Sequence, residues 1–507
     1  MLTVRAYGAS LEGAGAFAVT VEASFVARDD PLSTDVILTG LPDPVLRESR
    51  GKLLCALAAT RARLGPGRLY LNLVPAARKK SGEALDLALV LASAVAAGHL
   101  APESLDDALF LGEVGIDGRL HAVPGGLAAA VEARRLGLAR VIAPLETAAE
   151  AACLAGIAAH GARDLAEVFG LLTGAPDAAP ALKPPPDEAL PRPEAAQLDE
   201  VRGQAVGKLA LEIAAAGGHA LLFVGPPGAG KSMLARRLPG LLPEPTLDER
   251  IEITQVLSAA GRWPRGLARR RPFRAPHHTT SFAGLVGGGA PLVPGELTLA
   301  HQGVLFLDEL PEFSREALEA LRQPLEEGIV HLARATHRAS LPARAQLVAA
   351  MNPCPCGHQG DPRVACVCPP FAVRRYRGRI SGPMLDRIDL RVCLEAAPPG
   401  DLVAAPPPPP ERSGLAVAAR VAAARRAQRA RGQAGANAAL SGDELDRLAP
   451  MERGALRLLE LAVDRRALSS RALQAVRRVA RTVADLAGDE RLDEAHVSQA
   501  LGLRAAL

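Results

Sequence analysis

The segment at residues 225–232 constrains the fold of this chain more than any other. It reads Gly-Pro-Pro-Gly-Ala-Gly-Lys-Ser and matches the pattern GxxxxGK[ST]. The apolar run 220–224 before it predicts a buried strand, and the amphipathic run 233–242 after it predicts a helix. A strand, a glycine-rich turn and a helix start in this order point backbone N–H groups at phosphate oxygens. The alternative, a chance glycine-rich turn, is disfavoured by these flanks.

Side chains of the same segment supply the remaining contacts to a nucleotide. Lys231 would reach the β- and γ-phosphates, and the Ser232 hydroxyl would bind Mg²⁺. We therefore predict a site for ATP or GTP with Mg²⁺, formed by Gly225, Pro226, Pro227, Gly228, Ala229, Gly230, Lys231 and Ser232.

Two proline-rich stretches divide the chain, which at 507 residues is too long for a single core. We predict extended linkers at 176–195 and 397–412, because runs of proline favour extended, semi-rigid backbone. The three predicted domains are then 1–175, 196–396 and 413–507.

The three segments differ in their expected secondary structure. The first mixes strands, expected at 16–22 and 69–73, with helices, expected at 84–97 and 126–136. The second alternates strands with helices around the phosphate loop, which predicts a doubly wound α/β domain. The third has no strand signal and predicts a small helical bundle, with helices at 415–431, 442–448, 452–467, 470–487 and 493–501.

Charge and hydropathy exclude some classes of protein. The net charge of +4 gives no global argument for binding nucleic acid. The N-terminus lacks the apolar region of a signal peptide, and the longest uncharged apolar stretch, 87–98, is too short to span a bilayer. We expect a cytoplasmic protein that does not bind membranes.

Two further strands are predicted to end in polar residues beside the phosphate loop. The apolar run 303–307 is followed by Asp308, which would hold Mg²⁺, and Glu309, which would activate the attacking water. The run 345–351 is followed by Asn352, whose amide would orient that water. The alternatives are ordinary strands that end in exposed acids or in a capping asparagine.

Two arginines further along the chain are candidates for stabilising charge in the transition state. Arg387 lies in Leu-Asp-Arg-Ile-Asp, and Arg471 lies at the start of a predicted helix. An arginine from a neighbouring subunit can serve phosphoryl transfer in this way. A plain surface role is the alternative for each, because arginine is abundant here.

This ordered set resembles the motifs of AAA+ ATPases. The resemblance makes 225–232 the Walker A motif, Asp308 and Glu309 the Walker B motif, and Asn352 sensor 1. Arg387 becomes an arginine finger acting in trans, and Arg471 becomes sensor 2. It further implies ATP as the nucleotide, a helical lid at the C-terminus and a ring, expected to be a homo-hexamer.

A distinctive insert narrows the resemblance to the magnesium-chelatase-like YifB/ComM family. The resemblance covers nearly the whole chain and rests on segments 271–289, 294–301, 303–311, 351–357 and 385–390. It implies a P-loop AAA+ module of α/β class with a helical lid, preceded by a Lon-protease-like α/β domain. The family includes a hexameric DNA helicase that promotes branch migration during natural transformation.

The N-terminal segment resembles the Lon proteolytic fold at 80–87 and 112–127. A Lon protease needs a serine nucleophile and a lysine base. At the matching positions this chain has Ala84 and Ala128, while Ser81 and Lys80 are misplaced. We therefore expect the fold without peptidase activity.

Four cysteines follow the sensor strand within fifteen residues. Cys354, Cys356, Cys366 and Cys368 lie in a Gly/Pro-rich stretch, and four thiolates suit tetrahedral Zn²⁺. The CxC spacing also leaves open that His358 replaces one thiol, or that the loop holds no metal.

Basic runs at 262–278, 374–379 and 420–431 would suit phosphate contacts without reading a base sequence. The main hypothesis is an ATP-driven motor on DNA, such as a helicase. The alternatives are a chelatase-like or protein-remodelling ATPase, and a regulator whose Lon-like domain binds proteins. Solvated basic faces or contacts between subunits would explain the arginines equally well.

Overall fold

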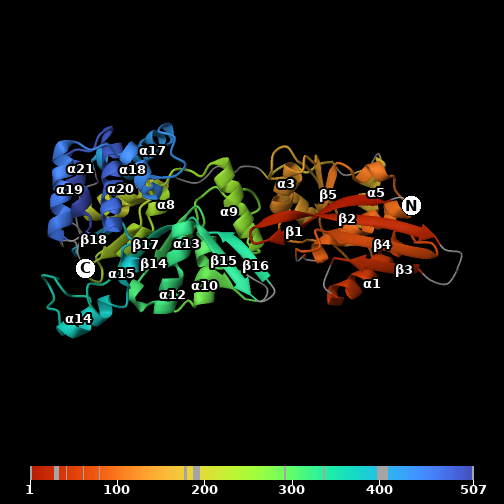
Figure 1. Ribbon diagram of the computed structural model, residues 1–507, viewed down its shortest axis with the longest axis horizontal. Coiled ribbons are helices and arrows are strands. Elements are labelled where there is room, and N and C mark those ends of the chain that lie inside the picture. The colour runs from red at the N-terminus through yellow and green to blue at the C-terminus, as the bar shows by residue number, and fades with distance from the viewer. Residues whose placement is uncertain are drawn as a thin grey trace. The chain divides into compact units, whose positions relative to one another are not determined.

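The computed structural model describes residues 3–27, 34–40, 43–60, 62–78, 80, 82–175, 178, 180–185, 194–289, 293–334, 337–396, 409–466 and 468–504. Ser81 and most of both predicted linkers lie outside these residues. The chain forms two compact units (Figure 1). The first comprises residues 1–188 together with 250–268 and 331–341, and the second comprises the rest. The predicted domain boundaries stay a prediction.

The first unit is built on a seven-stranded mixed sheet, ordered β3-β4-β2-β1-β5-β8-β9. Its antiparallel part is β1 (Val4–Glu12), β2 (Gly15–Ala27) and β4 (Gly67–Val74), and β3 (Thr34–Thr39) joins β4 in parallel. The parallel part continues through β5 (Ala108–Phe110), β8 (Arg140–Pro144) and β9 (Ala158–Ala162). The predicted strands 16–22 and 69–73 are confirmed as parts of β2 and β4.

Helices cover this sheet: α1 (Asp43–Ala59), α2 (Asp86–Ala96), α3 (Gly126–Arg135), α4 (Leu145–Ala151) and α5 (Leu165–Thr173). The predicted helix 84–97 begins as a 3₁₀ turn, Glu83–Leu85, and continues as α2. A small β-ribbon is formed by β6 (Glu113–Val114) and β7 (Leu120–His121).

Residues from the middle of the chain complete the first unit. Helix α9 (Leu247–Ala259) places Ile251 in the same apolar cluster as Leu127 and Ala148. The Ser258 hydroxyl accepts a hydrogen bond from the Gly125 N–H at 3.2 Å. The hairpin of β15 (Ile329–Arg334) and β16 (His337–Pro342) contributes residues 331–341 to this unit.

The second unit contains a five-stranded parallel sheet, ordered β11-β14-β17-β10-β18. Its strands are β10 (Leu221–Val224), β11 (Phe273–Arg274), β14 (Val304–Leu307), β17 (Gln346–Met351) and β18 (Leu390–Cys393). The three central strands are apolar because helices cover both faces of such a sheet. The predicted α/β class and the three site strands are confirmed.

Helices lie before, between and after the strands of this sheet in the chain. They are α6 (Ala205–Gly217), α7 (Lys231–Ala235), α8 (Leu238–Leu241), α10 (Phe282–Val286), α11 (Glu296–Leu299), α12 (Arg315–Ala320), α13 (Arg322–Glu327), α14 (Pro370–Arg377) and α15 (Gly382–Leu385). The prediction of one helix over 233–242 is wrong. Pro239 has no N–H to donate to the preceding turn, so the helix breaks between Ala235 and Leu238.

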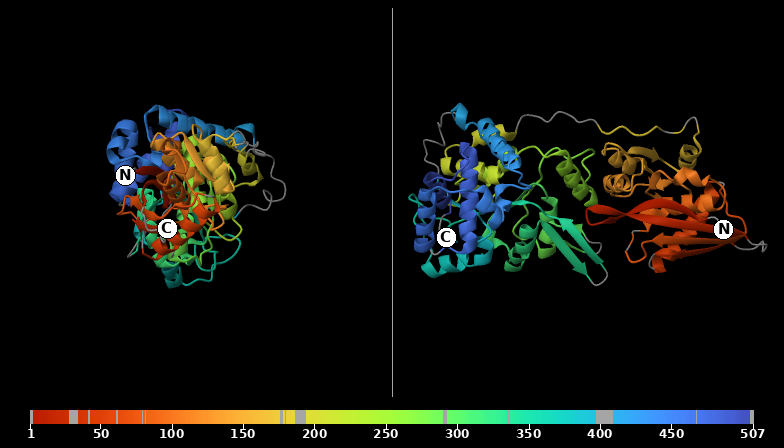
Figure 2. Two further views of the ribbon diagram at one scale, coloured as in Figure 1. Left: turned by 90° about the vertical axis from the view of Figure 1, so that its right-hand side faces the viewer. Right: turned by 45° about the horizontal axis from the view of Figure 1, so that its top comes forward.

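The C-terminal helices, blue in Figure 2, are α17 (Gly414–Ala430), α18 (Gly442–Leu448), α19 (Arg453–Arg466), α20 (Ser470–Ala487) and α21 (Glu494–Gly502). They confirm the predicted bundle to within two residues at each end. Val421, Val479 and Val497 join the apolar core that also contains Phe223 and Phe306 of the sheet. Among the described residues, none of the helices has the length and apolar character needed to cross a lipid bilayer.

Asp86 provides a test of the first unit. Its carboxyl is 7% exposed and accepts a hydrogen bond from the Val114 N–H at 3.4 Å. Burial raises its pKa from 3.8 to about 7, although the Val114 hydrogen bond and Lys52 oppose the shift. The folded state therefore holds a proton that the unfolded chain releases, and its stability falls as the pH rises toward 7.

We predict that this carboxyl lowers the free energy of unfolding by about 2–3 kcal/mol between pH 5 and pH 8. Asp86→Asn carries no titrating group and should lose that part of the pH dependence. Urea unfolding of both proteins at the two pH values measures the difference. Equal pH dependence in the two proteins would contradict the prediction.

Candidate nucleotide-binding site

The predicted phosphate loop connects β10 to α7 at the carboxyl edge of the parallel sheet. Gly228 and Gly230 have φ angles of 78° and 85°, which favour glycine. A Cβ on Gly225 would lie 2.6 Å from the Leu394 carbonyl oxygen, so only glycine fits there. The loop is thus held in a shape that other residues would disturb.

The Lys231 amine lies inside this loop. It donates hydrogen bonds to the carbonyl oxygens of Gly225 at 2.7 Å and Pro226 at 2.9 Å, and to Asn352 Oδ1 at 3.0 Å. Burial lowers the pKa of this amine below its ordinary value, and the charges of Asp308 and Glu309 offset only part of that shift. The structure therefore brings the predicted lysine and the predicted sensor asparagine into direct contact.

The two predicted magnesium ligands also meet. The Ser232 hydroxyl donates a hydrogen bond to Asp308 Oδ2 at 2.6 Å. Mg²⁺ in nucleotide sites takes few protein oxygens and completes its octahedron with water and phosphate. A hydroxyl next to a carboxylate, directly beside a phosphate loop, fits that donor set.

Glu309 has an unusual backbone and a half-exposed side chain. Its φ of 52° lies in the left-handed region, and its N–H donates to Asp308 Oδ1 at 3.0 Å. A residue other than glycine in this region is strained, and such strain gathers at functional sites. The side chain is 56% exposed, so water can reach the carboxylate.

His278 contacts Glu309 and was not predicted as a site residue. Its Nδ1 lies 3.3 Å from Glu309 Oε2, and its ring lies against that of His277 with centroids 4.1 Å apart and planes tilted by 33°. His278 follows β11, which pairs in parallel with β14. The sequence offered one indication of this contact: His278 lies four residues after β11, the neighbour of the strand that leads to Asp308 and Glu309.

The remaining two predicted residues lie together, but they are not bonded to the phosphate loop. Arg387 and Arg471 each bind one oxygen of Glu326, at 2.5 Å. Within the described residues, neither guanidinium forms a hydrogen bond or ion pair with residues 225–232. Glu326 belongs to no motif in the sequence, and its contacts with both arginines become visible only in the folded chain.

The four cysteines form one cluster. Their sulfur atoms all lie within 4.8 Å of one another, with Cys354 Sγ 3.4 Å from Cys356 Sγ and 3.6 Å from Cys366 Sγ. In tetrahedral Zn²⁺ sites the Zn–S distance of about 2.3 Å places the sulfurs roughly 3.8 Å apart. His358 is outside the cluster, with its Nδ1 3.5 Å from an oxygen of Asp361.

The thiols of this cluster have opposed pKa shifts. Backbone N–H groups of His358 and Val367 lower the pKa of Cys356 to about 6. A backbone hydrogen bond from Cys356 lowers the pKa of Cys368, but burial and the thiols of Cys356 and Cys354 outweigh it and raise the pKa to about 12. Crowded thiolates repel one another, and a bound cation would remove that cost.

In the first unit, the positions of the predicted missing dyad are buried. Ala84 and Ala128 are 8% and 2% exposed. The nearby Lys80 amine donates to the carbonyl oxygens of Pro75 at 2.5 Å, and of Gly40 and Arg78 at 3.1 Å each. All three protons of this amine therefore have acceptors in the described chain.

Comparison with known proteins places this architecture. The family model "Magnesium chelatase, subunit ChlI" matches residues 197–402, its C-terminal model matches 411–504, and "Subunit ChlI of Mg-chelatase" matches 27–147. An uncharacterized protein YifB of Salmonella typhimurium is 39% identical over 476 residues, covering 92% of this chain and 91% of the relative.

Two further relatives have similar coverage. An uncharacterized protein of Mycobacterium tuberculosis is 41% identical over 507 residues, covering 99% of this chain and 98% of the relative. The competence protein ComM of Haemophilus influenzae is 38% identical over 477 residues, covering 92% and 91%. The chain belongs to the YifB/ComM family of magnesium-chelatase-like AAA+ ATPases.

Proposed function

We propose that this protein is a cytoplasmic ring motor of six copies that hydrolyses ATP to move DNA strands. The observation that carries the ATPase chemistry is the convergence of Lys231 with Asn352 and of Ser232 with Asp308. In this proposal Lys231 binds the phosphates, and Ser232 and Asp308 hold Mg²⁺, which neutralises charge on the phosphates. Glu309 polarises the attacking water, whose position Asn352 fixes.

The proposal of DNA as the substrate rests on two weaker supports. The relative from Haemophilus influenzae is named a competence protein. In addition, the guanidinium groups of several exposed arginines in the predicted basic runs form no hydrogen bond or ion pair with the part of the chain that the structure describes: Arg262, Arg265, Arg374, Arg375, Arg426 and Arg429. Free guanidinium groups suit phosphate contacts that fall off with salt.

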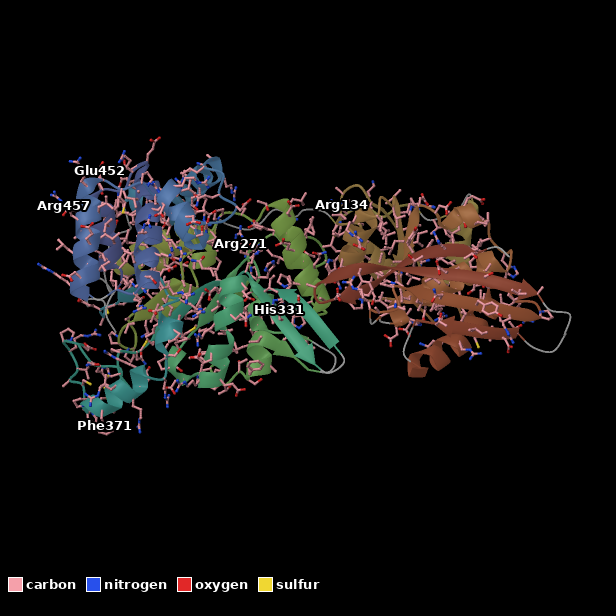
Figure 3. All side chains as sticks on the ribbon, in the orientation of Figure 1. Arg134, Arg271, His331, Phe371, Glu452 and Arg457 are labelled. Carbon is pink, nitrogen blue, oxygen red and sulfur yellow. The ribbon has the colours of Figure 1, made fainter. Side chains whose placement is uncertain are left out.

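Other arginines of the same runs are used inside the protein. Arg271, labelled in Figure 3, binds Glu249 at 2.8 Å, and Arg274 binds both oxygens of Glu296. Arg425 donates to the Ala215 carbonyl oxygen. A protein-remodelling or chelatase-like ATPase therefore remains the second candidate, because the basic runs alone do not require nucleic acid.

We further propose that the first unit has the Lon-protease-like fold without peptidase activity. The alanines at 84 and 128 offer neither a nucleophile nor a base. In the regulator hypothesis, this unit would instead serve as a docking module for other proteins.

Two substitutions test the ATPase assignment. Lys231→Ala should abolish ATP binding, because the phosphates lose their lysine contact. Glu309→Gln should retain ATP binding and lower kcat by about a hundredfold or more, because the water loses its base. Equilibrium binding of a fluorescent ATP analogue and steady-state phosphate release measure the two effects. Full turnover in Glu309→Gln would show that another group activates the water.

DNA should stimulate the ATPase. Forked and single-stranded DNA should each raise the rate of phosphate release, and the binding affinity should fall steeply between 50 and 200 mM salt. If neither DNA raises turnover and no salt-sensitive binding appears, the DNA motor is wrong. Casein is the comparison substrate: stimulation by casein without cleavage would favour protein remodelling, and ATP-dependent cleavage would contradict the loss of the dyad.

We propose Zn²⁺ as the occupant of the cysteine cluster. Protein purified without added metal should contain about one zinc per chain, because four thiolates satisfy one tetrahedral ion. Cys366→Ser should lose that zinc and melt at a lower temperature, whereas Cys55→Ser, an exposed cysteine outside the cluster, should keep it. Metal content is read by plasma emission spectrometry. Zinc-free wild-type protein with an unchanged melting temperature after chelation would exclude a structural metal.

A further inference from the structure

One carboxylate links three distant segments of the second unit. Glu326 lies near the end of α13, where its Oε2 binds Nη2 of Arg387 and its Oε1 binds Nη2 of Arg471, at 2.5 Å each. Arg387 lies between α15 and β18, and Arg471 lies in the first turn of α20, 145 residues from Glu326. Both arginines of the proposed ATPase are therefore oriented by the same acid.

The two arginines are held to different degrees. Arg387 also donates from Nε to the Arg322 carbonyl oxygen at 3.0 Å and from Nη1 to the Pro383 carbonyl oxygen at 2.9 Å, and its side chain is 14% exposed. Arg471 donates only to Glu326 within the described chain and is 40% exposed. Arg387 is thus fixed in place, whereas Arg471 has unused N–H donors and depends on Glu326 for its orientation.

Stability alone gives little reason for this arrangement. The Glu326 side chain is 52% exposed, and ion pairs at exposed sites contribute little to the free energy of unfolding. Burial raises the pKa of Glu326, but the charges of Arg387 and Arg471 outweigh it and the pKa lies below its ordinary value. The carboxylate is therefore charged at neutral pH, and its charge weakens the attraction of both arginines for phosphate. What the arrangement provides is a fixed orientation of the two guanidinium groups by Glu326.

We propose that Glu326 is a positioning residue for ATP hydrolysis, holding Arg471 beside the fixed Arg387 so that both guanidinium groups meet the γ-phosphate of an ATP bound by a neighbouring copy of the chain. This inference rests on the proposed ring ATPase. Glu326 touches no reacting atom. It restricts the rotamers of the Arg471 side chain before the phosphate arrives. The entropy cost of ordering that side chain is therefore not added to the barrier of the reaction.

Glu326→Gln tests the inference through the separation of kcat from KM. The amide keeps the size of the side chain but loses the charge and one acceptor. We expect kcat to fall about tenfold, because Arg471 is no longer fixed. KM for ATP should stay the same or fall, because removing a negative charge cannot repel the phosphates. Glu326→Asp, whose shorter carboxylate still carries charge, should give an intermediate kcat.

Glu316→Gln is the matched control. This exposed acid on α12 forms no hydrogen bond or ion pair with the described chain, so its loss should leave kcat unchanged. All variants are assayed at equal concentration after sedimentation has measured the mass of the assembly. An unchanged kcat in Glu326→Gln, a rise in KM alone, or a smaller assembly would each overturn the positioning role.

Arg471→Ala and Arg387→Ala separate this inference from the proposed function. If both lose kcat while Glu326→Gln keeps it, the arginines act in hydrolysis and only the positioning role of Glu326 is wrong. If both keep full kcat, the roles that the AAA+ resemblance implies for the two arginines are wrong, and the inference fails with them.

Discussion

The parallel register of β10, β14 and β17 is the constraint on which the nucleotide site depends. Val224 pairs with Met351, and Leu307 pairs with Ala349. Parallel strands place their carboxyl ends at one edge of the sheet. The residues that follow each strand are therefore close together in the fold although they are far apart in the sequence. A slip of one residue in one pairing would turn the side chains of that strand to the opposite face. The bonds from Lys231 and Ser232 to their partners would then be lost.

This constraint explains which site residues the sequence could predict. Asp308 and Asn352 directly follow apolar runs and Glu309 follows Asp308, so strand recognition and a rule about strand ends were sufficient to group them. Glu326 has no such marker. Its proposed role rests on contacts with residues 61 and 145 positions away, and no local period or spacing encodes such pairings. The break at Pro239 was predictable in principle, because proline cannot donate within a helix.

The cysteine cluster is adjacent to the site rather than a separate module. Cys354 lies two residues after Asn352, and Arg377 of α14 donates to the Pro353 carbonyl oxygen between them at 3.1 Å. A Cβ on Gly357 would lie 2.7 Å from Pro227 of the phosphate loop. The loop that carries the cysteines therefore packs against the phosphate loop. Whatever stiffens the cysteine loop also limits the movement of Asn352 and Pro227.

The arginines show why composition could not identify the substrate. Within one predicted run, Arg420 binds Glu212, Arg425 binds a backbone carbonyl and Arg431 binds Asp485, so these charges fasten α17 to the rest of the second unit. Arg426 and Arg429 of the same helix are exposed. The arginines of one run thus divide into some that bind groups inside the second unit and others that are open to solvent. Only the exposed arginines, such as Arg426 and Arg429, have guanidinium groups that can reach a phosphate outside the protein.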